Sequence, residues 1–283
     1  MKITDKKFQS AILSRDVIEA ELNKTNDEDI LILDGLERFS KIAKIHNHDT
    51  ITIGSETGYG KTALAINIAN SCLKTYNVIY VNLSNNDIDM QERLIAQATN
   101  CDIDDITDDI VDRYCDDILK DCNQLMFFND ANLDNVINFI KDVCSISKQT
   151  VIVIIDNINN IYTNSHNYEK LEEVSKELRK LSRNTNIILF NLAQLSRASI
   201  KAENSIIDCN VHSFADARIE NHSTHVIFFG EKNFKDYLIL KKNRYGVKGV
   251  ETQTEVDYCR KTQNIKECPP RRIEPLPPRI RRY

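Results

Sequence analysis

Residues 51–62 are Ile-Thr-Ile-Gly-Ser-Glu-Thr-Gly-Tyr-Gly-Lys-Thr, and they carry the strongest indication of the fold. An apolar, β-branched start precedes a glycine-rich middle, and a helical apolar pattern begins at Ala63. In the pattern G-x-x-x-x-G-K-[ST], backbone N–H groups wrap phosphates, the lysine reaches the β- and γ-phosphates, and the hydroxyl holds Mg²⁺. Ser55 stands at the first position, one residue after Gly54. The end of the pattern is matched by Gly60, Lys61 and Thr62. The stretch predicts a phosphate-binding loop between a strand and a helix, with a functionless glycine turn as the alternative.

A second segment completes the expected nucleoside triphosphate site. Residues 151–156 are Val-Ile-Val-Ile-Ile-Asp, a pattern typical of a buried strand that ends in a carboxylate. Triphosphatases use such a carboxylate, together with the loop hydroxyl, to hold Mg²⁺. We therefore expect Thr62 and Asp156 to hold the metal; the alternative is that Asp156 only caps its strand. The residues expected around the nucleotide are Ser55, Glu56, Thr57, Gly58, Tyr59, Gly60, Lys61, Thr62 and Ala63.

The remaining sequence supports an α/β fold. The chain has 283 residues, enough for one α/β domain with short extensions. Short apolar runs alternate with helical stretches, which predicts a mostly parallel central sheet flanked by helices. We expect an N-terminal docking helix and tether over residues 1–29, the α/β domain over 30–266 and an extended tail over 267–283. The expected strands are Thr50–Gly54, Val78–Leu83, Leu125–Asn129, Val151–Asp156, Ile187–Leu192, His225–Phe229 and Tyr237–Lys242.

The composition argues against several classes of protein. No apolar run is long enough to cross a bilayer, and the N-terminus lacks the apolar core of a secretion signal. The eight cysteines have no C-x-x-C pair and no regular spacing, which indicates reduced thiols rather than disulfides or a zinc site. The net charge of −5 does not by itself indicate nucleic-acid binding, although it can hide a local basic surface. We expect a cytoplasmic protein without a membrane partner.

Four segments carry weaker patterns. Residues 7–22 have a loosely amphipathic spacing that predicts the docking helix. Residues 101–117 interleave carboxylates with isoleucines, which is typical of a solvated helix face; a partner-binding patch is the alternative. The last fifteen residues, 269–283, hold all five prolines and predict an extended tail, whose arginines bind nucleic acid, a neighbouring subunit or a loader protein, or only improve solubility. His46-Asn-His48 predicts a turn between a helix and a strand.

Several separated segments resemble, in the same order, the RecA-like ATPase domain of the DnaB family of replicative helicases. The similarity covers about residues 30–266. It implies a RecA-like P-loop NTPase core that binds ATP and Mg²⁺. The matching segments are Gly58–Ala69 (the phosphate loop and its helix), Phe127–Asp130 (the third strand), Ile155–Ile161 (the metal-carboxylate strand), Glu173–Arg183 and Ile187–Arg197 (a helix and the sensor strand), and Leu240–Gly246 (a K-x-R-x-G hairpin).

The resemblance also implies roles for individual residues beside Lys61 and Asp156. In the family, the glutamine at the position of Gln194 contacts the γ-phosphate and couples its presence to DNA-binding loops. The lysine and arginine at the positions of Lys242 and Arg244 reach the nucleotide of a neighbouring subunit, where an arginine finger stabilises transition-state charge. Both are expected on one strand, two residues apart, so they project from the same face; a solvated basic hairpin is the alternative. The expected DNA contacts are Arg197 and Arg218.

The function that the resemblance implies is an ATP-dependent DNA helicase motor in DNA replication. We expect a homo-oligomeric ring, a hexamer, that binds ATP and Mg²⁺ between subunits, hydrolyses the ATP and moves along single-stranded DNA. The N-terminal helix would dock on the next subunit. Further expected partners are a loader or a primase.

The sequence also departs from the family pattern. A glutamate that orients the attacking water follows the second strand in the family, whereas Ser84 follows Val78–Leu83 here. Glu56 and Asp87 are two carboxylates that could substitute for it. The segment 212–221 has less glycine than the family's DNA-contacting loop, and about fifty residues precede the phosphate loop, too few for the family's separate N-terminal domain. The alternatives are an ATP-binding assembly or regulatory protein with weak or no hydrolysis, and a RecA-like recombinase or clock-type ATPase.

Overall fold

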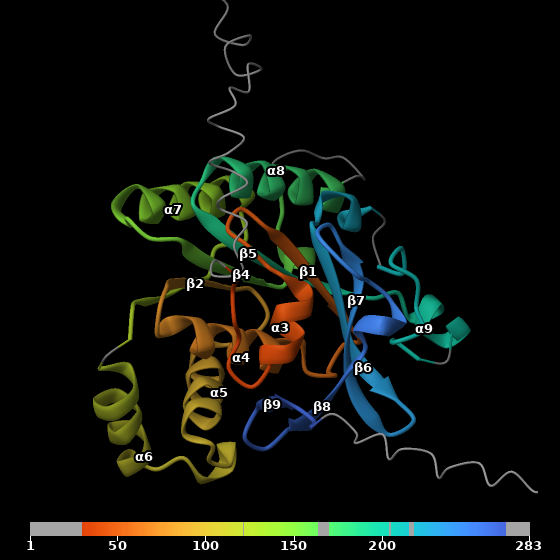
Figure 1. Cartoon of the computed structure of the whole chain (residues 1–283). Helices are drawn as coiled ribbons and strands as arrows, with labels where there is room; N and C mark the ends of the chain where they lie inside the picture. The colour runs from red at the N-terminus through yellow and green to blue at the C-terminus, as the bar shows by residue number, and fades with distance from the viewer. Residues whose placement is uncertain (1–29, 121, 164–169, 204, 215–217, 270–283) are drawn as a thin grey trace, which may run out of the picture.

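The chain forms an α/β fold around one large sheet (Figure 1). The computed structural model describes residues 30–120, 122–163, 170–203, 205–214 and 218–269. The predicted N-terminal docking helix and the proline-rich tail from residue 270 onward lie outside the described residues. Within the described residues, the sheet has nine strands in the order β3-β2-β4-β5-β1-β6-β7-β8-β9.

The strands from β3 to β6 in this order pair in parallel, and β6 to β9 pair antiparallel. All seven predicted strands are present, and the mostly parallel sheet is confirmed. The last two strands were not predicted. The bounds are β1 Thr50–Ser55, β2 Asn77–Asn82, β3 Leu125–Phe128, β4 Val151–Asp156, β5 Ile187–Gln194, β6 His225–Lys232, β7 Lys235–Asn243, β8 Thr254–Cys259 and β9 Asn264–Glu267.

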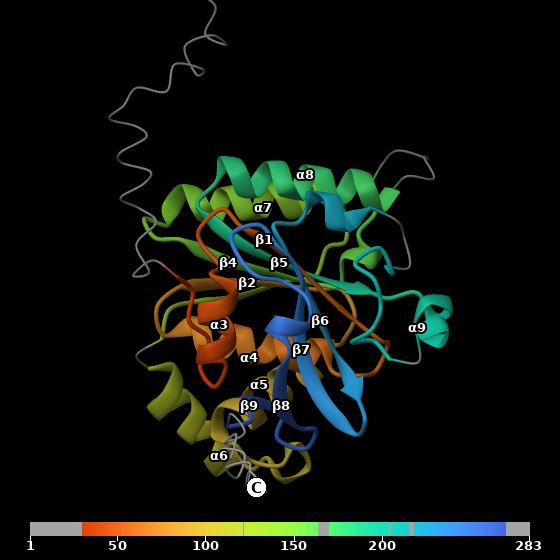
Figure 2. The same cartoon turned by 45° about the vertical axis from the view of Figure 1, so that its right-hand side comes forward.

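Helices cover both faces of the sheet, as Figures 1 and 2 show from two sides. α7 and α8 lie on one face, and α3, α4 and α5 lie on the other. A strand buried on both faces needs apolar residues at every position, which explains the continuous apolar runs of β2 and β4. The bounds are α3 Glu37–Ala43, α4 Lys61–Leu73, α5 Asp87–Thr99, α6 Asp108–Arg113, α7 Leu133–Ile146, α8 Lys170–Asn184 and α9 Arg197–Glu203.

Alternating side chains of each strand enter two separate cores. Val78 and Tyr80 of β2 pack in the core beneath α4, whereas Ile79 and Val81 pack in the core beneath α7 and α8. This alternation follows from the two-residue period of a strand. The two cores fix the sheet from both sides and hold the carboxyl ends of its parallel strands in place.

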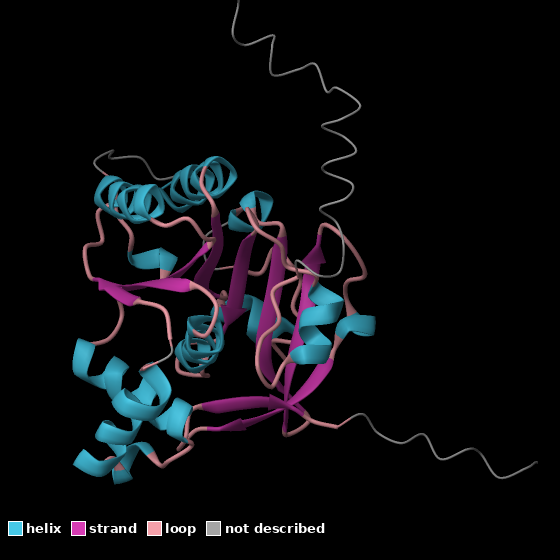
Figure 3. Ribbon diagram, turned by 60° about the vertical axis from the view of Figure 1, so that its left-hand side comes forward, coloured by secondary structure: helices cyan, strands magenta, loops and turns pink. Residues whose placement is uncertain are grey.

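The acidic segment lies at one corner of the molecule beside α5 (Figure 3). Residues 103–119 form a short 3₁₀ turn, α6 and a π-helical turn, and most of their carboxylates are exposed. The predicted solvated helix face is therefore present, although it is broken into three pieces. The predicted turn at His46-Asn-His48 is also present between α3 and β1.

Three findings concern membrane-spanning helices, disulfides and metal-binding clusters. No helix among the described residues is long and apolar enough to span a membrane. The eight cysteines all fall within the described residues and all are free thiols. The described ranges contain no group of three or more His, Cys, Asp or Glu side chains arranged to hold a metal ion.

Candidate nucleotide site

The carboxyl ends of the central parallel strands bring the predicted site residues to one edge of the sheet. Ser55 at the end of β1 pairs in register with Gln194 at the end of β5. Asp156 at the end of β4 pairs with Asn82 at the end of β2. Ligands of open α/β sheets bind at this edge, where the loops and helix N-termini converge. Gln194 is half-buried there, and its backbone N–H donates to Asn159 Oδ1 at 3.1 Å.

The loop between β1 and α4 has the geometry of a phosphate cradle. Gly58 and Gly60 have φ angles of 78° and 133°, which residues other than glycine rarely adopt. A Cβ atom on Gly60 would also lie 2.7 Å from the Tyr258 ring. Lys61 starts α4, so the N-terminus of this helix faces the loop. The glycine requirement at position 60 therefore has two independent causes.

Lys61 folds back onto its own loop. Its Nζ donates to the carbonyl oxygens of Ser55 at 3.1 Å and Glu56 at 2.9 Å. Burial lowers the pKa of Lys61 to about 8, although the charges of Asp156 and Glu56 raise it. The ammonium therefore lies within the loop, bonded to two carbonyl oxygens. A bound phosphate would take their place as its hydrogen-bond partner.

The two predicted metal ligands contact each other. Thr62 Oγ1 donates to Asp156 Oδ2 at 2.8 Å, and the Tyr80 hydroxyl donates to the same oxygen at 3.0 Å. Burial raises the pKa of Asp156, while the hydrogen bonds from Thr62 and Tyr80 act in the opposite direction. A hydroxyl and a carboxylate oxygen are the hard donors that Mg²⁺ prefers, so these residues fit that ion.

Ser84 stands where the family pattern has a glutamate. Ser84 is exposed, and its Oγ donates to the backbone carbonyl of Asp156 at 3.3 Å. Asp87 Oδ1 accepts from the side-chain amides of Asn82 and Asn129, each at 3.0 Å. These bonds hold Asp87 beside the ends of β2 and β3. A role for Asp87 as a substitute base stays a prediction.

Glu56, the other carboxylate considered, belongs to the phosphate loop and is exposed. Its backbone carbonyl accepts from Lys61 Nζ at 2.9 Å, so the residue lies beside the lysine of the loop. Its carboxylate has no recorded hydrogen bond or ion pair within the described part of the chain. No described carboxylate therefore occupies the place of the family's glutamate after β2.

Lys242 and Arg244 lie at the opposite edge of the sheet. Lys242 pairs with Val226 near the start of β6, and the Arg244 backbone N–H donates to Thr224 O at 3.1 Å. β1 runs parallel to β6, so the phosphate loop lies beyond the other end of β1, about 17 Å along the strand. The two basic residues therefore do not belong to the phosphate loop of their own chain.

The prediction that both basic residues lie on one strand is wrong for Arg244. β7 ends at Asn243, so Arg244 belongs to the following turn and is exposed. Lys242 is half-buried, and its Nζ donates to Glu220 O at 2.7 Å. Burial lowers the pKa of Lys242, and the Glu220 carboxylate raises it. The two side chains therefore have different surroundings, and only Arg244 extends freely into solvent.

The two predicted DNA contacts are both exposed. Arg197 begins α9, directly after the sensor strand. Arg218 precedes the start of β6 and forms a surface ion pair with Glu172 at 3.5 Å. A bridge between Leu195 and Phe214 joins the two loop segments that carry these arginines. The bridged residues lie next to the phosphate loop, because the Leu195 N–H donates to Ser55 O at 3.3 Å.

An aromatic cluster beside the phosphate loop was missed from the sequence. The guanidinium carbon of Arg260 lies 5.8 Å from the centre of the Tyr59 ring and 5.6 Å from that of the Tyr258 ring. Phe229 contacts both tyrosines edge-on, and the Tyr59 hydroxyl donates to Asp236. The alternation Thr254-Glu-Val-Asp-Tyr258 was the available signal for this strand. The cluster presents flat, polarisable side chains next to the phosphate cradle.

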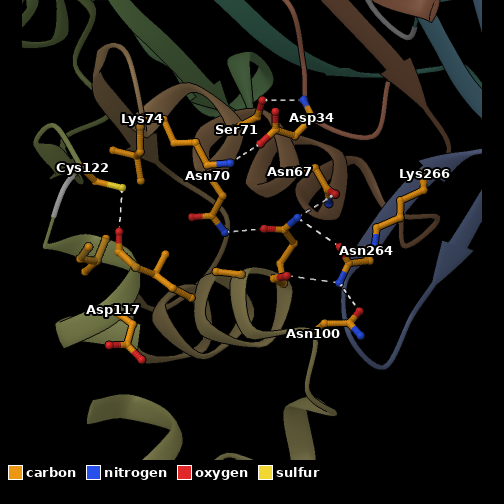
Figure 4. A pocket seen from close by; sticks show the side chains of 15 residues that line it. Asp34, Asn67, Asn70, Ser71, Lys74, Asn100, Asp117, Cys122, Asn264 and Lys266 are labelled. Atoms are coloured by element: carbon orange, nitrogen blue, oxygen red, sulfur yellow. Dashed lines mark hydrogen bonds and ion pairs between the residues drawn. The ribbon is translucent and has the colours of Figure 1, made fainter. Parts of the chain in front are cut away.

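A separate polar pocket lies between α4, α5 and β9 (Figure 4). Its amide side chains bond to one another: Asn70 donates to Gln97 at 2.6 Å, and Gln97 donates to Asn67 at 3.1 Å and to Asn264 at 3.3 Å. Lys74 and Asp34 pair at 2.6 Å beside it. The network joins α4, α5 and β9, and no residue of the phosphate loop lines the pocket.

Comparisons with known proteins agree with this geometry. The family model described as "DnaB-like helicase C terminal domain" matches residues 34–263. One solved structure, described as an ATPase domain, matches with a TM-score of 0.76 and 16% identity, over 94% of this chain and 100% of that chain. A DnaB-like replicative helicase, reported with its interactions with primase, matches with a TM-score of 0.77 and 17% identity, over 92% of this chain and 71% of that chain. These identities show a shared fold. Curated protein sequences give no match.

Proposed function

We propose, on the premise that the chain belongs to the family of DnaB-like helicase C-terminal domains, that it is an ATP-driven helicase motor acting as a ring on single-stranded DNA. One observation supports this proposal most directly. The phosphate loop and Arg244 lie at opposite edges of the sheet. In a head-to-tail ring, such as a hexamer, Arg244 of one subunit would complete the nucleotide site of the next.

Within one subunit, Lys61 would bind the β- and γ-phosphates, and Thr62 with Asp156 would hold Mg²⁺, whose charge offsets that of the phosphates. Gln194, next to Ser55 in register, would contact the γ-phosphate. Tyr258 and Arg260 would stack on the base, because flat aromatic and guanidinium groups bind base faces. Lys242 would support the hairpin that carries Arg244.

The partners follow from the same proposal. Arg197 and Arg218 would contact the phosphates of single-stranded DNA, since exposed guanidinium groups pair with phosphate oxygens. The solved helicase of similar fold is reported with primase, which makes a primase one partner to test for this chain, and a loader another. The division into a tether over residues 1–29, an ATPase domain over 30–266 and a tail over 267–283 stays a prediction, as does the cytoplasmic location.

We expect the affinity for ATP to fall as the pH rises through about 8. The protonated ammonium of Lys61 is the form that binds phosphate, and burial lowers its pKa to about 8 in the free protein. Above that pH, binding requires proton uptake, so the affinity approaches a loss of about tenfold per pH unit. Titration of a fluorescent ATP analogue on both sides of this pH measures the effect. Lys61→Arg, which stays charged, should flatten the profile; an equally steep profile in that variant would contradict the assignment.

A second function is favoured by Ser84. General-base activation of the attacking water contributes about 10²- to 10⁴-fold to a rate, and no described carboxylate replaces the family's glutamate after β2. The chain would then bind ATP and hydrolyse it slowly, with nucleotide occupancy setting its state of assembly. This alternative shares the nucleotide site with the motor and differs from it in turnover.

Steady-state ATP turnover with and without single-stranded DNA separates the two functions. For the motor we expect DNA-stimulated turnover that Lys61→Ala abolishes, because this variant loses the phosphate-binding ammonium. For the slow alternative we expect tight ATP binding with turnover that DNA does not stimulate. Lys74→Ala, which removes an exposed lysine outside the loop, is the matched control. Absence of ATP binding in the wild-type chain would overturn both.

A further inference from the structure

A buried polar cluster lies at the amino ends of the central strands, at the edge that carries Arg244. Asp49 precedes β1 and is 1% exposed, and His225 begins β6 and is fully buried. Tyr245 follows Arg244 in the turn after β7 and is 50% exposed, with its hydroxyl directed into the cluster. Buried ionisable groups are costly unless they are paired, and the proposed chemistry uses neither Asp49 nor His225. The cluster therefore calls for a separate explanation.

Tyr245 is held on several sides. Its hydroxyl donates to Asp49 Oδ1 at 3.2 Å, and Asp49 Oδ2 accepts from the His46 backbone N–H at 2.9 Å. The rings of His46 and His225 each have their centres 5.8 Å from the centre of the Tyr245 ring. His225 Nε2 donates to Ala43 O at 2.9 Å, and its Nδ1 lies 3.9 Å from Asp49 Oδ2. The half-exposed tyrosine ring thus packs against two histidines, and its hydroxyl is bonded to a carboxylate.

The neighbouring helix α8 strengthens the same cluster. Arg179 Nη1 donates to His48 O at 2.7 Å and to Thr50 Oγ1 at 3.3 Å. The charge of Asp49 acts favourably on Arg179, whereas that of Arg244 acts unfavourably. In the His46-Asn-His48 turn, the His46 ring packs against Tyr245 and the His48 carbonyl accepts from Arg179. It joins α8 and β1 to the turn that carries Arg244.

Arg244 combines a fixed backbone with a free side chain. Its N–H donates to Thr224 O at 3.1 Å, and the next residue is anchored through Asp49. Its guanidinium is exposed and has no recorded hydrogen bond or ion pair within the described part of the chain. A flexible side chain reaches a target most effectively when the backbone beneath it is held in place.

We propose that Tyr245, anchored on Asp49, is a positioning residue that aims Arg244 at the nucleotide of the neighbouring subunit. This inference rests on the proposed function, because it presumes that Arg244 acts between subunits. It goes further by assigning the aim of the finger to one hydroxyl–carboxylate hydrogen bond. Tyr245 itself touches neither nucleotide nor metal.

Mixed assemblies test the proposal with a binding measurement, so hydrolysis is not required. Acceptor subunits carry Arg244→Ala and keep an intact phosphate loop; donor subunits carry Lys61→Ala and keep Arg244. The probe is Mg²⁺ with N-methylanthraniloyl-ATP, which the acceptor loops bind. We expect donors to tighten this binding about tenfold, the usual effect of a hydrogen bond to a charged group. Donors that also carry Tyr245→Phe should lose most of the tightening.

The position of the substitution separates aiming from general structure. Tyr245→Phe placed in the acceptor, whose finger is already absent, should leave the affinity unchanged. Tyr237→Phe in the donor removes a hydroxyl from β7 elsewhere and is the matched control. The melting temperature and assembly size are measured for every mixture. If Tyr245→Phe does not fold, Asp49→Ala in the donor, which removes the acceptor, replaces it, and we expect the same loss.

Two failures can be told apart. If donors with an intact Tyr245 give no tightening in verified mixed assemblies, the intersubunit role of Arg244 fails and the inference fails with it. If they tighten binding and the folded Tyr245→Phe donors, or the Asp49→Ala donors, tighten it equally, Arg244 keeps its role and the positioning role of Tyr245 is overturned.

Discussion

Replacing Ser84 with glutamate is expected to raise the ATP turnover of this chain by about 10²- to 10⁴-fold, the usual contribution of a positioned general base. Ser84 follows β2 beside Asp156, where family members place the glutamate that orients the attacking water. The residue is exposed, so the larger side chain requires no repacking of the core. Steady-state phosphate release in the presence of single-stranded DNA measures the change.

Two variants make this result specific. Ser84→Gln has nearly the same shape but no basic carboxylate, so we expect its turnover to stay near that of the wild-type chain. Adding Lys61→Ala to Ser84→Glu should remove the gain, because the phosphates are no longer held. Equal turnover in the glutamate and glutamine variants would contradict a role as base. A wild-type rate that already matches family motors would show that another group activates the water.

Replacing Arg244 with alanine in the Ser84→Glu background is expected to lower turnover by about 10³-fold or more, the range measured for arginine fingers. The side chain is exposed and forms no hydrogen bond or ion pair among the described residues, so the fold should tolerate the change. Arg244→Lys should recover little, because an ammonium lacks the planar fork of guanidinium. Lys248→Ala, in the same turn and also exposed, is the matched control.

Subunit mixing shows whether Arg244 acts between chains. Arg244→Ala subunits have intact loops, and Lys61→Ala subunits have intact fingers, so each variant alone should be inactive. Mixed in one ring, some interfaces combine an intact loop with an intact finger, and turnover should return. A flat response across mixing ratios, with mixed assembly verified by mass, would show that Arg244 does not act in trans.

The sequence was sufficient for the parts of the fold that depend on local pattern. The apolar runs of β2 and β4 are buried on both faces, so their sequence alone indicates strands. β8 was missed because it is short and partly charged, although its residues alternate: Thr254 and Val256 face the core, while Asp257 is exposed. Such a short, partly charged strand depends on pairing with β7 and on contacts with distant helices, which a local pattern does not contain.

In the candidate site, too, the residues that belong to local motifs were the predictable ones. Lys61, Thr62 and Asp156 belong to local motifs, and the structure brings them together as expected. The pairing of Asp87 with Asn129 depends on which strand neighbours β2, and the position of Arg244 depends on where β7 ends. Tyr258 contacts Gly60 across nearly two hundred residues of sequence. These relations arise from topology, so the sequence pattern alone did not reveal them.

β7 contributes to two nucleotide sites in the proposed ring. Near its start, Asp236 accepts a hydrogen bond from Tyr59 of the phosphate loop in its own subunit. Just past its end, Arg244 would face the site of a neighbour. β7 and the turn after it would therefore contact two nucleotide sites that belong to different subunits. A substitution that displaces β7 would then alter both sites at once.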